Sequence, residues 1–409
     1  MAKSTATPAR RRSPGEGSVY HTDDGRWRGA LTWTEPDGRR RRRVVSGRTS
    51  EQARDRLDDL RRELRIGTIA PSGRRLTVGD YLSQWIERDR SRVRPSTWRT
   101  REMHIRCYLV PTLGRLPLAR LTPAEVERAL AGFLTTGRPQ RPETRTRGRQ
   151  NAAGISPLTV RHIRATLRRA LADAVRDGLV GRNVAADARP VPVPHRPVSY
   201  LEAPLVRRLL DATEADEYGP LYALAVSTGL RLGELLGLGW ADIDLVAGTL
   251  TVRRSLALAR DGGWALSQPK SARSRRTIPL PALARDALGC QRERQGATRQ
   301  AAGPAWQDQD GLVFTDAIGR PLRPHGVSAA FQRARDAAGL PRVRFHDLRH
   351  SAATLMLAEG VPLAVISEWL GHAGIAITAA HYAAVVPALR RDAAAAMDRA
   401  LDGQREGRP

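Results

Sequence analysis

A run of prolines divides this chain into two parts. Proline makes up four of the nine residues from Arg189 to Pro197. Because proline fixes its own φ and has no backbone N–H to donate, such a run forms an extended, semi-rigid connector and neither a helix nor a strand. We therefore predict a linker over residues 186–199, and the 409 residues of the chain are enough for two or three domains, each with its own core.

The charge of the chain indicates a polyanionic partner. Lys and Arg number 68 and Asp and Glu number 42, which gives a formal net charge of +26 at pH 7. This excess favours nucleic acid over an anionic membrane, and no apolar run approaches the ~20 residues that a membrane span requires. We find no secretory leader and no zinc, P-loop or dinucleotide pattern, and the two cysteines lack metal-ligand spacing. The expected location is a reducing cytoplasm, in association with the nucleoid.

Residues 15–72 are predicted to form a small α+β domain, after a basic and disordered tail at 1–14. Alternating segments are separated by Asp-Asp-Gly and Pro-Asp-Gly, a pattern that predicts a three-stranded antiparallel sheet with tight turns. The expected strands cover residues 17–20, 27–33 and 39–45. A helix is expected to follow, with Ser50 as its N-cap and its end near Arg65.

Five consecutive arginines lie on the third expected strand. They are Arg39, Arg40, Arg41, Arg42 and Arg43. Such a run is either a solvated face or, beside exposed aromatic residues on a small sheet, a surface that enters a DNA groove.

Residues 76–185 are predicted to be entirely helical. Apolar residues at three-to-four spacing mark helices near 78–90, 95–109, 123–134 and 157–177. The residues expected to start three of these helices are Thr77, Thr122 and Ser156. The polar, arginine-rich residues 137–154 are expected to form a flexible loop. Along the last helix, arginines form either ordinary surface or a stripe that follows DNA phosphates: Arg161, Arg164, Arg168 and Arg169.

Residues 200–398 are predicted to be mainly helical, with a small hairpin-like sheet, and residues 399–409 to be a disordered tail. Gly229 can end one helix so that Arg231 begins the next. Lys270 is one of two lysines among 68 basic residues, and unlike arginine a lysine can release its proton near neutral pH. Three further groups of residues complete the pattern: His346 with Arg349, Trp369-Leu370-Gly371-His372, and Tyr382.

Together these residues resemble the tyrosine recombinase (phage integrase) family, with a match over about 200–395. The residues that carry the resemblance are Arg231, Lys270, His346, Arg349, His372 and Tyr382. The resemblance implies a catalytic domain at 200–398, a SAM-like core-binding domain at 76–185 and an arm-type DNA-binding domain at 15–72. It implies a site-specific integrase of a mobile element that acts on double-stranded DNA attachment sites as a homotetramer. An excisionase and a DNA-bending host factor are further partners to be expected.

The chemistry of strand exchange explains these residue types. Without a metal ion, ATP or another cofactor, the guanidiniums of Arg231 and Arg349 stabilise charge on the non-bridging phosphate oxygens. Tyr382 is the nucleophile, and its phosphate ester stays reversible because a phenol leaves more easily than an alcohol. Lys270 gives a proton to the departing 5′ oxygen. By the resemblance, the products are a 3′-phosphotyrosyl link and a free 5′ hydroxyl.

The remaining polar residues support this chemistry. By the resemblance, His346 relays protons from the tyrosine and His372 donates to the scissile phosphate. Glu234 and Asp347 are general bases, metal ligands or, as we favour, the partners that hold the first arginine and the helix of the histidines.

Three other functions compete with the integrase. A Xer-like resolvase of DNA multimers generally lacks an N-terminal sheet domain, so residues 15–70 argue against it. A catalytically idle DNA-binding regulator would have lost residues that are all present here. A type IB topoisomerase has similar chemistry but lacks this pair of DNA-binding blocks. The sequence leaves open the target sites, the kind of mobile element, the need for accessory proteins and whether residues 387–401 dock in cis or in trans.

Overall fold

The computed structural model describes residues 17–34, 40–65, 76–137, 154–194, 198–268, 275–308, 310–372, 374 and 397. Contacts between residues divide the protein into two compact units. The division comes after His195, within the predicted linker. Residues 189–194 form no helix or strand. The predicted tails at 1–14 and 399–409 lie outside the described residues. No described helix is long and apolar enough to cross a membrane.

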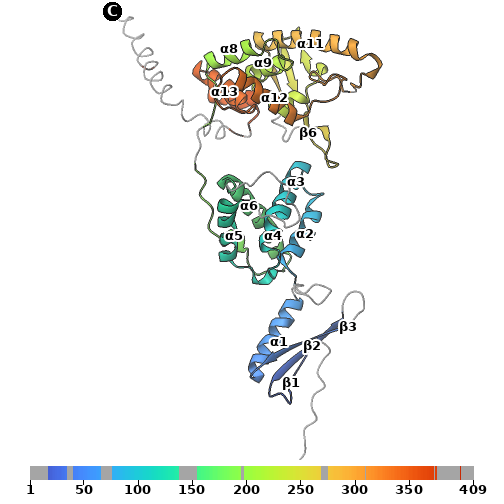
Figure 1. Cartoon of the computed structure of the whole chain (residues 1–409), viewed down its shortest axis with the longest axis vertical. Coiled ribbons are helices and arrows are strands. Elements are labelled where there is room, and N and C mark those ends of the chain that lie inside the picture. The colour runs from blue at the N-terminus through green and yellow to red at the C-terminus, as the bar shows by residue number, and fades with distance from the viewer. Residues whose placement is uncertain are drawn as a thin grey trace, which may run out of the picture. The chain divides into compact units, whose positions relative to one another are not determined.

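The first domain is a three-stranded antiparallel sheet with a helix packed on one face (Figure 1). Its elements are β1 (Ser18–His21), β2 (Trp27–Thr34), β3 (Arg40–Gly47) and α1 (Ser50–Arg65). The predicted sheet and helix are therefore confirmed. Leu57 and Leu60 of α1 are buried with Leu31 of β2. The predicted N-cap is wrong, because Ser50 is the first helical residue and the Gln52 N–H donates to the Thr49 hydroxyl at 3.2 Å.

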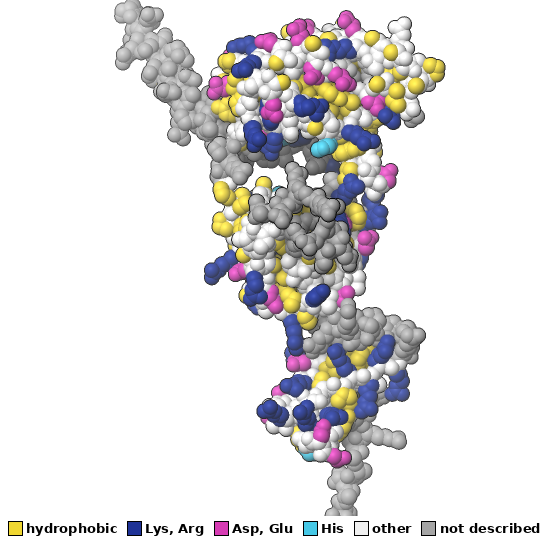
Figure 2. Space-filling model, viewed as in Figure 1, with side chains coloured by type: hydrophobic (Ala, Val, Ile, Leu, Met, Phe, Trp, Pro, Cys, Tyr) yellow, Lys and Arg dark blue, Asp and Glu magenta, His cyan; other side chains and the backbone are white. Residues whose placement is uncertain are grey.

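The arginine run on β3 is divided between the two faces of the sheet, because side chains alternate along a strand. Arg43 pairs with Leu31, whose side chain is buried under α1, so Arg43 lies on the helix side. Arg42 lies on the opposite, open face, where it donates to the Tyr20 hydroxyl at 3.5 Å. Arg39 lies outside the described residues. Figure 2 shows Lys and Arg side chains spread over this domain, and those drawn there in blue are arginines because both lysines lie outside the described residues.

The second domain is helical, as predicted. Its elements are α2 (Val78–Asp89), α3 (Pro95–His104), a π-helical stretch (Ile105–Leu109), α4 (Val110–Leu113), a 3-10 turn (Leu118–Arg120), α5 (Pro123–Thr136), α6 (Pro157–Arg176) and α7 (Val184–Asp187). Thr77, Thr122 and Ser156 each accept a backbone N–H at the start of their helix, which confirms all three starts. Most of the predicted loop, residues 138–153, lies outside the described residues.

One arginine of α6 has a structural task. Arg164 donates to the carbonyl of Ala186 at 3.1 Å and to that of Ala188 at 2.5 Å. These carbonyls lie at the end of α7, where helix geometry leaves acceptors without partners. Arg161 and Arg168 are exposed on the same helix. The structure thus separates an arginine that caps a helix from arginines that are exposed to solvent.

The C-terminal unit is mainly helical with two small sheets. Its elements are α8 (Ala203–Ala212), α9 (Gly219–Thr228), α10 (Leu232–Leu236), a 3-10 turn (Trp240–Asp242), β4 (Ile243–Asp244), β5 (Thr249–Val252), β6 (Ser255–Leu258), β7 (Trp264–Ser267), β8 (Arg276–Pro279), α11 (Ala282–Ala302), a 3-10 turn (Gly303–Ala305), α12 (Pro324–Ala337), α13 (Asp347–Ala358) and α14 (Leu363–Leu370). The predicted hairpin-like stretch forms a three-stranded sheet, β4-β5-β8, and a separate β6-β7 hairpin. Helix α9 is buried on all sides against α11 and α13, and its end therefore lies deep in the unit.

His104 is a buried polar residue of the helical domain. Its Nδ1 lies 2.9 Å from the Thr166 hydroxyl, and burial, assisted by nearby His162, lowers its pKa to about 4. The unfolded chain has an ordinary histidine pKa near 6.5 and so binds more protons between these two values. The stability that His104 contributes is therefore present above about pH 6.5 and is lost as the pH falls toward 4.

We predict that His104→Gln removes this pH dependence. Between pH 7.5 and 5.5 the domain should lose roughly 1 kcal/mol more stability with His104 than with glutamine. The measurement is denaturant-dependent hydrogen exchange of full-length protein, read from peptides of α6, with peptides of α9 as an internal reference. Equal pH dependence of α6 in both proteins would contradict the prediction.

Candidate active site

Helix α14 ends at a glycine in the left-handed region. Gly371 has φ 64° and ψ 48°. Its N–H donates to the Glu368 carbonyl at 2.9 Å, and the N–H of His372 donates to the Ser367 carbonyl at 2.9 Å. This is the bonding pattern of a Schellman-type helix end. It leaves the carbonyls of residues 369–371 in need of donors from elsewhere in the protein.

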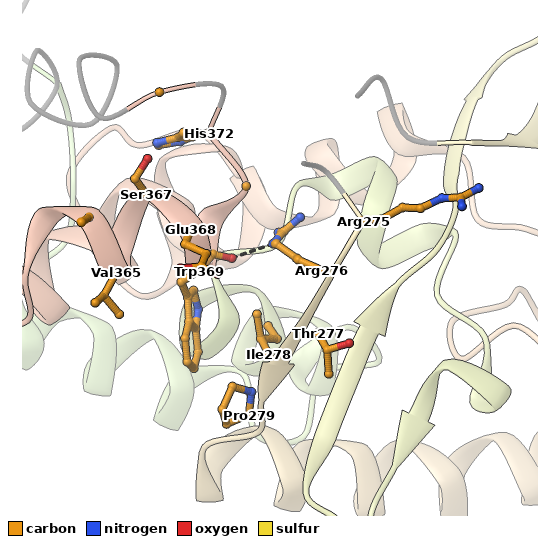
Figure 3. A pocket seen from close by; sticks show the side chains of 13 residues that line it. Arg275, Arg276, Thr277, Ile278, Pro279, Val365, Ser367, Glu368, Trp369 and His372 are labelled. Carbon is orange, nitrogen blue, oxygen red and sulfur yellow. Dashed lines mark hydrogen bonds between the residues drawn. The ribbon is translucent and has the colours of Figure 1, made fainter. Parts of the chain in front are cut away.

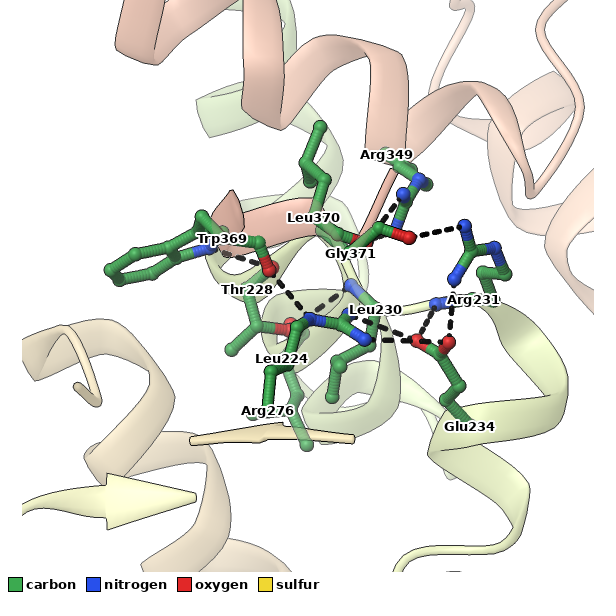
Figure 4. A network of polar contacts seen from close by, with 11 residues as sticks. Leu224, Thr228, Leu230, Arg231, Glu234, Arg276, Arg349, Trp369, Leu370 and Gly371 are labelled. Carbon is green, nitrogen blue, oxygen red and sulfur yellow. Dashed lines mark hydrogen bonds and ion pairs between the residues drawn. The ribbon is translucent and has the colours of Figure 1, made fainter. Parts of the chain in front are cut away.

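Three arginines from different elements supply these donors (Figure 4). The pairs, with their N···O distances, are Arg276 with the carbonyl of Trp369 (2.6 Å), Arg349 with that of Leu370 (2.6 Å) and Arg231 with that of Gly371 (3.2 Å). The C-terminal end of a helix carries partial negative charge, so guanidinium donors are favourable there. Arg231 and Arg349 are predicted catalytic residues, whereas Arg276 was not predicted from the sequence.

Arg349 also fixes the end of α9. Its Nη1 donates to the Gly229 carbonyl at 2.8 Å, and the residue is 3% exposed. Gly229 has φ 64° and ends α9, as predicted, and a Cβ there would lie 2.5 Å from the Cδ2 of Leu370. The Trp369 indole N–H donates to the Thr228 carbonyl at 2.9 Å, which joins the same two helix ends. Glycine at position 229 therefore permits the approach of α9 and α14 that Arg349 fastens.

Glu234 is a buried carboxylate shared by two arginines. It accepts from the backbone N–H of Arg231 at 3.1 Å and from its Nη1 at 2.7 Å. It accepts from Nη2 of Arg276 at 3.0 Å, and the side chains of Glu234 and Arg276 are 5% and 6% exposed. Burial alone would raise the pKa of the Glu234 carboxyl, but the charges and hydrogen bonds of both arginines outweigh burial and lower it. These contacts favour a partner that holds Arg231 over a general base or a metal ligand.

The start of α13 carries the first histidine of the pattern. Asp347 accepts from the backbone N–H of Arg344 at 2.7 Å and from its guanidinium at 2.8 Å, which holds the turn before the helix. His346 reaches solvent, yet desolvation by the surrounding protein and the positive charge of Arg349 lower its pKa below the ordinary value. Its ring is therefore neutral near pH 7 and able to accept a proton. The ring of His350 stands edge-on to it at 5.3 Å.

A cavity of about 800 Å³ opens beside the arginine network (Figure 3). It lies between β8 and α14 and is lined by apolar side chains such as Ile278 and Val365, with Arg276 and the half-buried His372 among its polar residues. His372 directly follows the carbonyl that Arg231 holds, so the network fixes the position from which the second histidine extends. Among the described residues, no group of three or more His, Cys, Asp or Glu side chains is placed to hold a metal ion.

Four of the six predicted catalytic residues lie in described parts of the chain, and the structure brings them to one region. They are Arg231, His346, Arg349 and His372. Lys270 and Tyr382 lie outside the described residues. The sequence signal for Arg276 was its spacing of two residues from Ile278 on an expected strand, because such residues share a face.

In the structure, Ile278 is buried opposite Leu250, so Arg276 also faces the core, where an arginine requires a partner.

Comparison with known proteins gives two family matches. Residues 200–388 match the Phage integrase family, and residues 77–133 match the phage integrase N-terminal SAM-like domain. The chain is 31% identical over 412 residues to an integrase of Streptomyces ambofaciens, covering 95% of this chain and 97% of that protein. It is 28% identical over 385 residues to a putative prophage phiRv2 integrase of Mycobacterium tuberculosis, covering 90% and 92%.

Solved structures share the fold. A lambda integrase dimer bound to a COC′ core site superposes with a TM-score of 0.56 at 22% identity, over 91% of this chain and 96% of that one. The Tn1549 transposon integrase in complex with a circular intermediate DNA gives a TM-score of 0.62 at 19% identity, over 75% and 95%. The lambda match extends over most of the chain.

We predict that Glu234→Gln destabilises the C-terminal unit by about 3 kcal/mol, because it leaves two guanidiniums without their buried countercharge. The change in the free energy of unfolding is measured by urea denaturation of the full-length protein, with hydrogen exchange in peptides of α10 as the readout. The matched control is Glu359→Gln, an exposed carboxylate after α13, which should change stability by no more than about 0.5 kcal/mol. Similar effects of the two substitutions would contradict the role of the shared carboxylate.

Proposed function

Because this chain belongs to the phage integrase family of tyrosine recombinases, which break and rejoin DNA, we propose that its arginine network binds the scissile phosphate during site-specific integration of a mobile element. Support comes from the convergence of Arg231 and Arg349 on adjacent carbonyls. A guanidinium presents five N–H donors in a planar fork that matches the geometry of phosphate oxygens. The Arg231 side chain is 38% exposed, so phosphate oxygens can reach it.

The proposed reaction is a transesterification in which the phenolic oxygen of Tyr382 attacks the scissile phosphorus. The bond from phosphorus to the 5′ oxygen breaks and a 3′-phosphotyrosyl bond forms. Neutral His346 takes the phenolic proton, and the Lys270 ammonium gives a proton to the departing 5′ oxygen. His372 and the two arginines donate to the non-bridging oxygens. A 5′ hydroxyl of the partner strand then attacks the phosphotyrosine, which rejoins DNA without metal, ATP or another cofactor.

The two preceding domains are proposed to bind duplex DNA. For the arm-type domain, the proposed surface is the open sheet face with Arg40 and Arg42. The rest of the arginine run, Arg39, Arg41 and Arg43, is proposed to make further contacts with DNA. For the core-binding domain, the proposed phosphate contacts are Arg161 and Arg168, both exposed on α6. Arg164 supports the fold of that surface through α7.

The proposed assembly is a homotetramer on two DNA duplexes. A lambda integrase tetramer has been solved bound to a Holliday junction, with a TM-score of 0.57 at 21% identity to this chain. An excisionase and a DNA-bending host factor are further proposed partners, and the proposed location is the cytoplasm, on the nucleoid. A resolvase would act within one molecule, so recombination between two separate DNA molecules distinguishes the integrase.

We predict that Tyr382→Phe abolishes the covalent protein–DNA adduct and leaves DNA binding intact, because only the nucleophilic oxygen is lost. Adducts that resist denaturant are counted on a nicked duplex that carries the core site of the mobile element, and binding is measured by gel shift. Tyr218→Phe, at the start of α9, is the matched control and should form adducts at the wild-type rate. An adduct formed by Tyr382→Phe would refute the assignment of Tyr382 as the nucleophile. If the wild-type protein forms no adduct, a catalytically idle DNA-binding regulator would be favoured.

We predict that Lys270→Arg retains binding but loses most strand cleavage, because the charge is kept and the releasable proton is lost. A DNA with a bridging 5′ sulfur supplies a leaving group that needs no proton. Single-turnover cleavage of this DNA should be restored in the variant toward the wild-type rate. Absence of such rescue would contradict the acid role of Lys270.

A further inference from the structure

Arg276 is a buried arginine with no part in the reaction proposed above. It begins strand β8, six residues after Lys270 in the sequence, and its side chain is 6% exposed. Its strand neighbours Thr277 and Ile278 are paired with Thr251 and Leu250 of β5, so the sheet fixes the backbone from which it extends. A charged side chain in such a place is costly unless its partners compensate for the lost water.

The partners of Arg276 come from two segments that are far apart in sequence. Nε donates to the Trp369 carbonyl at 2.6 Å, and Nη2 donates to Glu234 at 3.0 Å (Figure 4). Because the guanidinium is planar and rigid, one side chain sets the position of the carboxylate and of the helix end relative to each other. A lysine ammonium has no such fixed fork.

Both partners of Arg276 act on proposed phosphate-binding groups. Glu234 holds the backbone and guanidinium of Arg231, and the Trp369 carbonyl precedes by three residues the histidine at position 372. Without Arg276, the Glu234 carboxylate would have Arg231 as its one remaining arginine partner among the contacts described. The end of α14 would also lose one of its three guanidinium donors. Arg231 would then turn toward the carboxylate and away from the phosphate.

We propose that Arg276 is a positioning residue that holds Arg231 and the turn of His372 in register for the scissile phosphate. The proposal rests on the proposed function. The Nε and Nη2 donors of Arg276 are directed at protein acceptors, so its proposed effect on the phosphate passes through those acceptors.

The test compares Arg276→Gln and Arg276→Lys with wild type in single-turnover adduct formation on the nicked core-site duplex. Gel-shift binding should change less than about twofold. Adduct formation should fall about 10²-fold for glutamine, the cost of a small misplacement of a reacting group, and less for lysine, which keeps the charge beside Glu234. Unchanged adduct formation in both variants would overturn the proposal.

A second readout separates positioning from loss of folded protein. In a duplex with a methylphosphonate at the scissile position, a neutral methyl group replaces one charged oxygen. The rate of cleavage of this duplex therefore depends less on the charges of Arg231 and Arg349. The ratio of rates on the two duplexes is independent of the folded fraction. The Arg276→Gln defect should shrink on the methylphosphonate as the Arg231→Gln defect does. The double variant should lose less activity than the product of the two single losses, because part of the effect of Arg276 passes through Arg231. Equal defects on both duplexes, or additive losses, would overturn the proposal.

Arg294→Gln is the matched control, because it removes a guanidinium that donates to two backbone carbonyls, those of Glu214 and Asp216, away from this site. Its ratio of rates on the two duplexes should equal that of wild type. A shifted ratio would overturn the proposal, since loss of any arginine that binds backbone carbonyls would then produce the effect. Failure of wild type to form any adduct would refute the proposed function itself. A wild type that forms adducts beside an unimpaired Arg276→Gln would refute the positioning role alone.

Discussion

The carbonyl end of α14 is the interaction on which the C-terminal unit depends. A Schellman-type turn at Gly371 satisfies the preceding carbonyls and leaves the last three to guanidiniums from β8, α13 and the start of α10. These donors come from segments that are 21, 93 and 140 residues away from their acceptors in the chain. Each bond has an ionised donor and a helix-end acceptor, a combination stronger than a neutral pair. The same bonds that close the fold therefore gather positive charge at the end of α14, where the scissile phosphate is proposed to bind.

Arginines gathered in this way repel one another, and the structure offsets the repulsion with one buried carboxylate. Glu234 lies between Arg231 and Arg276 and stays ionised because their charges outweigh the effect of burial on its pKa. The side chain of Arg231 remains partly exposed to solvent, whereas that of Arg276 is buried. A neutral His346 nearby completes a site that can hold an anion and still accept a proton.

Local sequence patterns predicted a large part of this architecture. The strands of the first domain, the helices of the second and the caps at Thr77, Thr122 and Ser156 follow from periodicity and from hydroxyl side chains that accept backbone N–H groups. The N-cap of α1 was predicted at Ser50 but lies one residue earlier, because the hydroxyl of Thr49 accepts a backbone N–H of the helix as a serine hydroxyl would. Charge patterns were less informative, because an arginine that caps α7, such as Arg164, has the same local sequence signal as one that is exposed.

The sequence by itself determined the order of the domains, the types of residue available for phosphate chemistry and the helix end at Gly229, because each of these depends on residues close together in the chain. Only the tertiary structure decided that Glu234 is shared, that Arg276 joins it to α14, and that the run on β3 is split between an open face and a helix-covered one. The physical reason is that a guanidinium forms its bonds with whatever acceptors the fold brings within reach. Glu234 and Arg276 are 42 positions apart in the chain, so no local pattern records the pair.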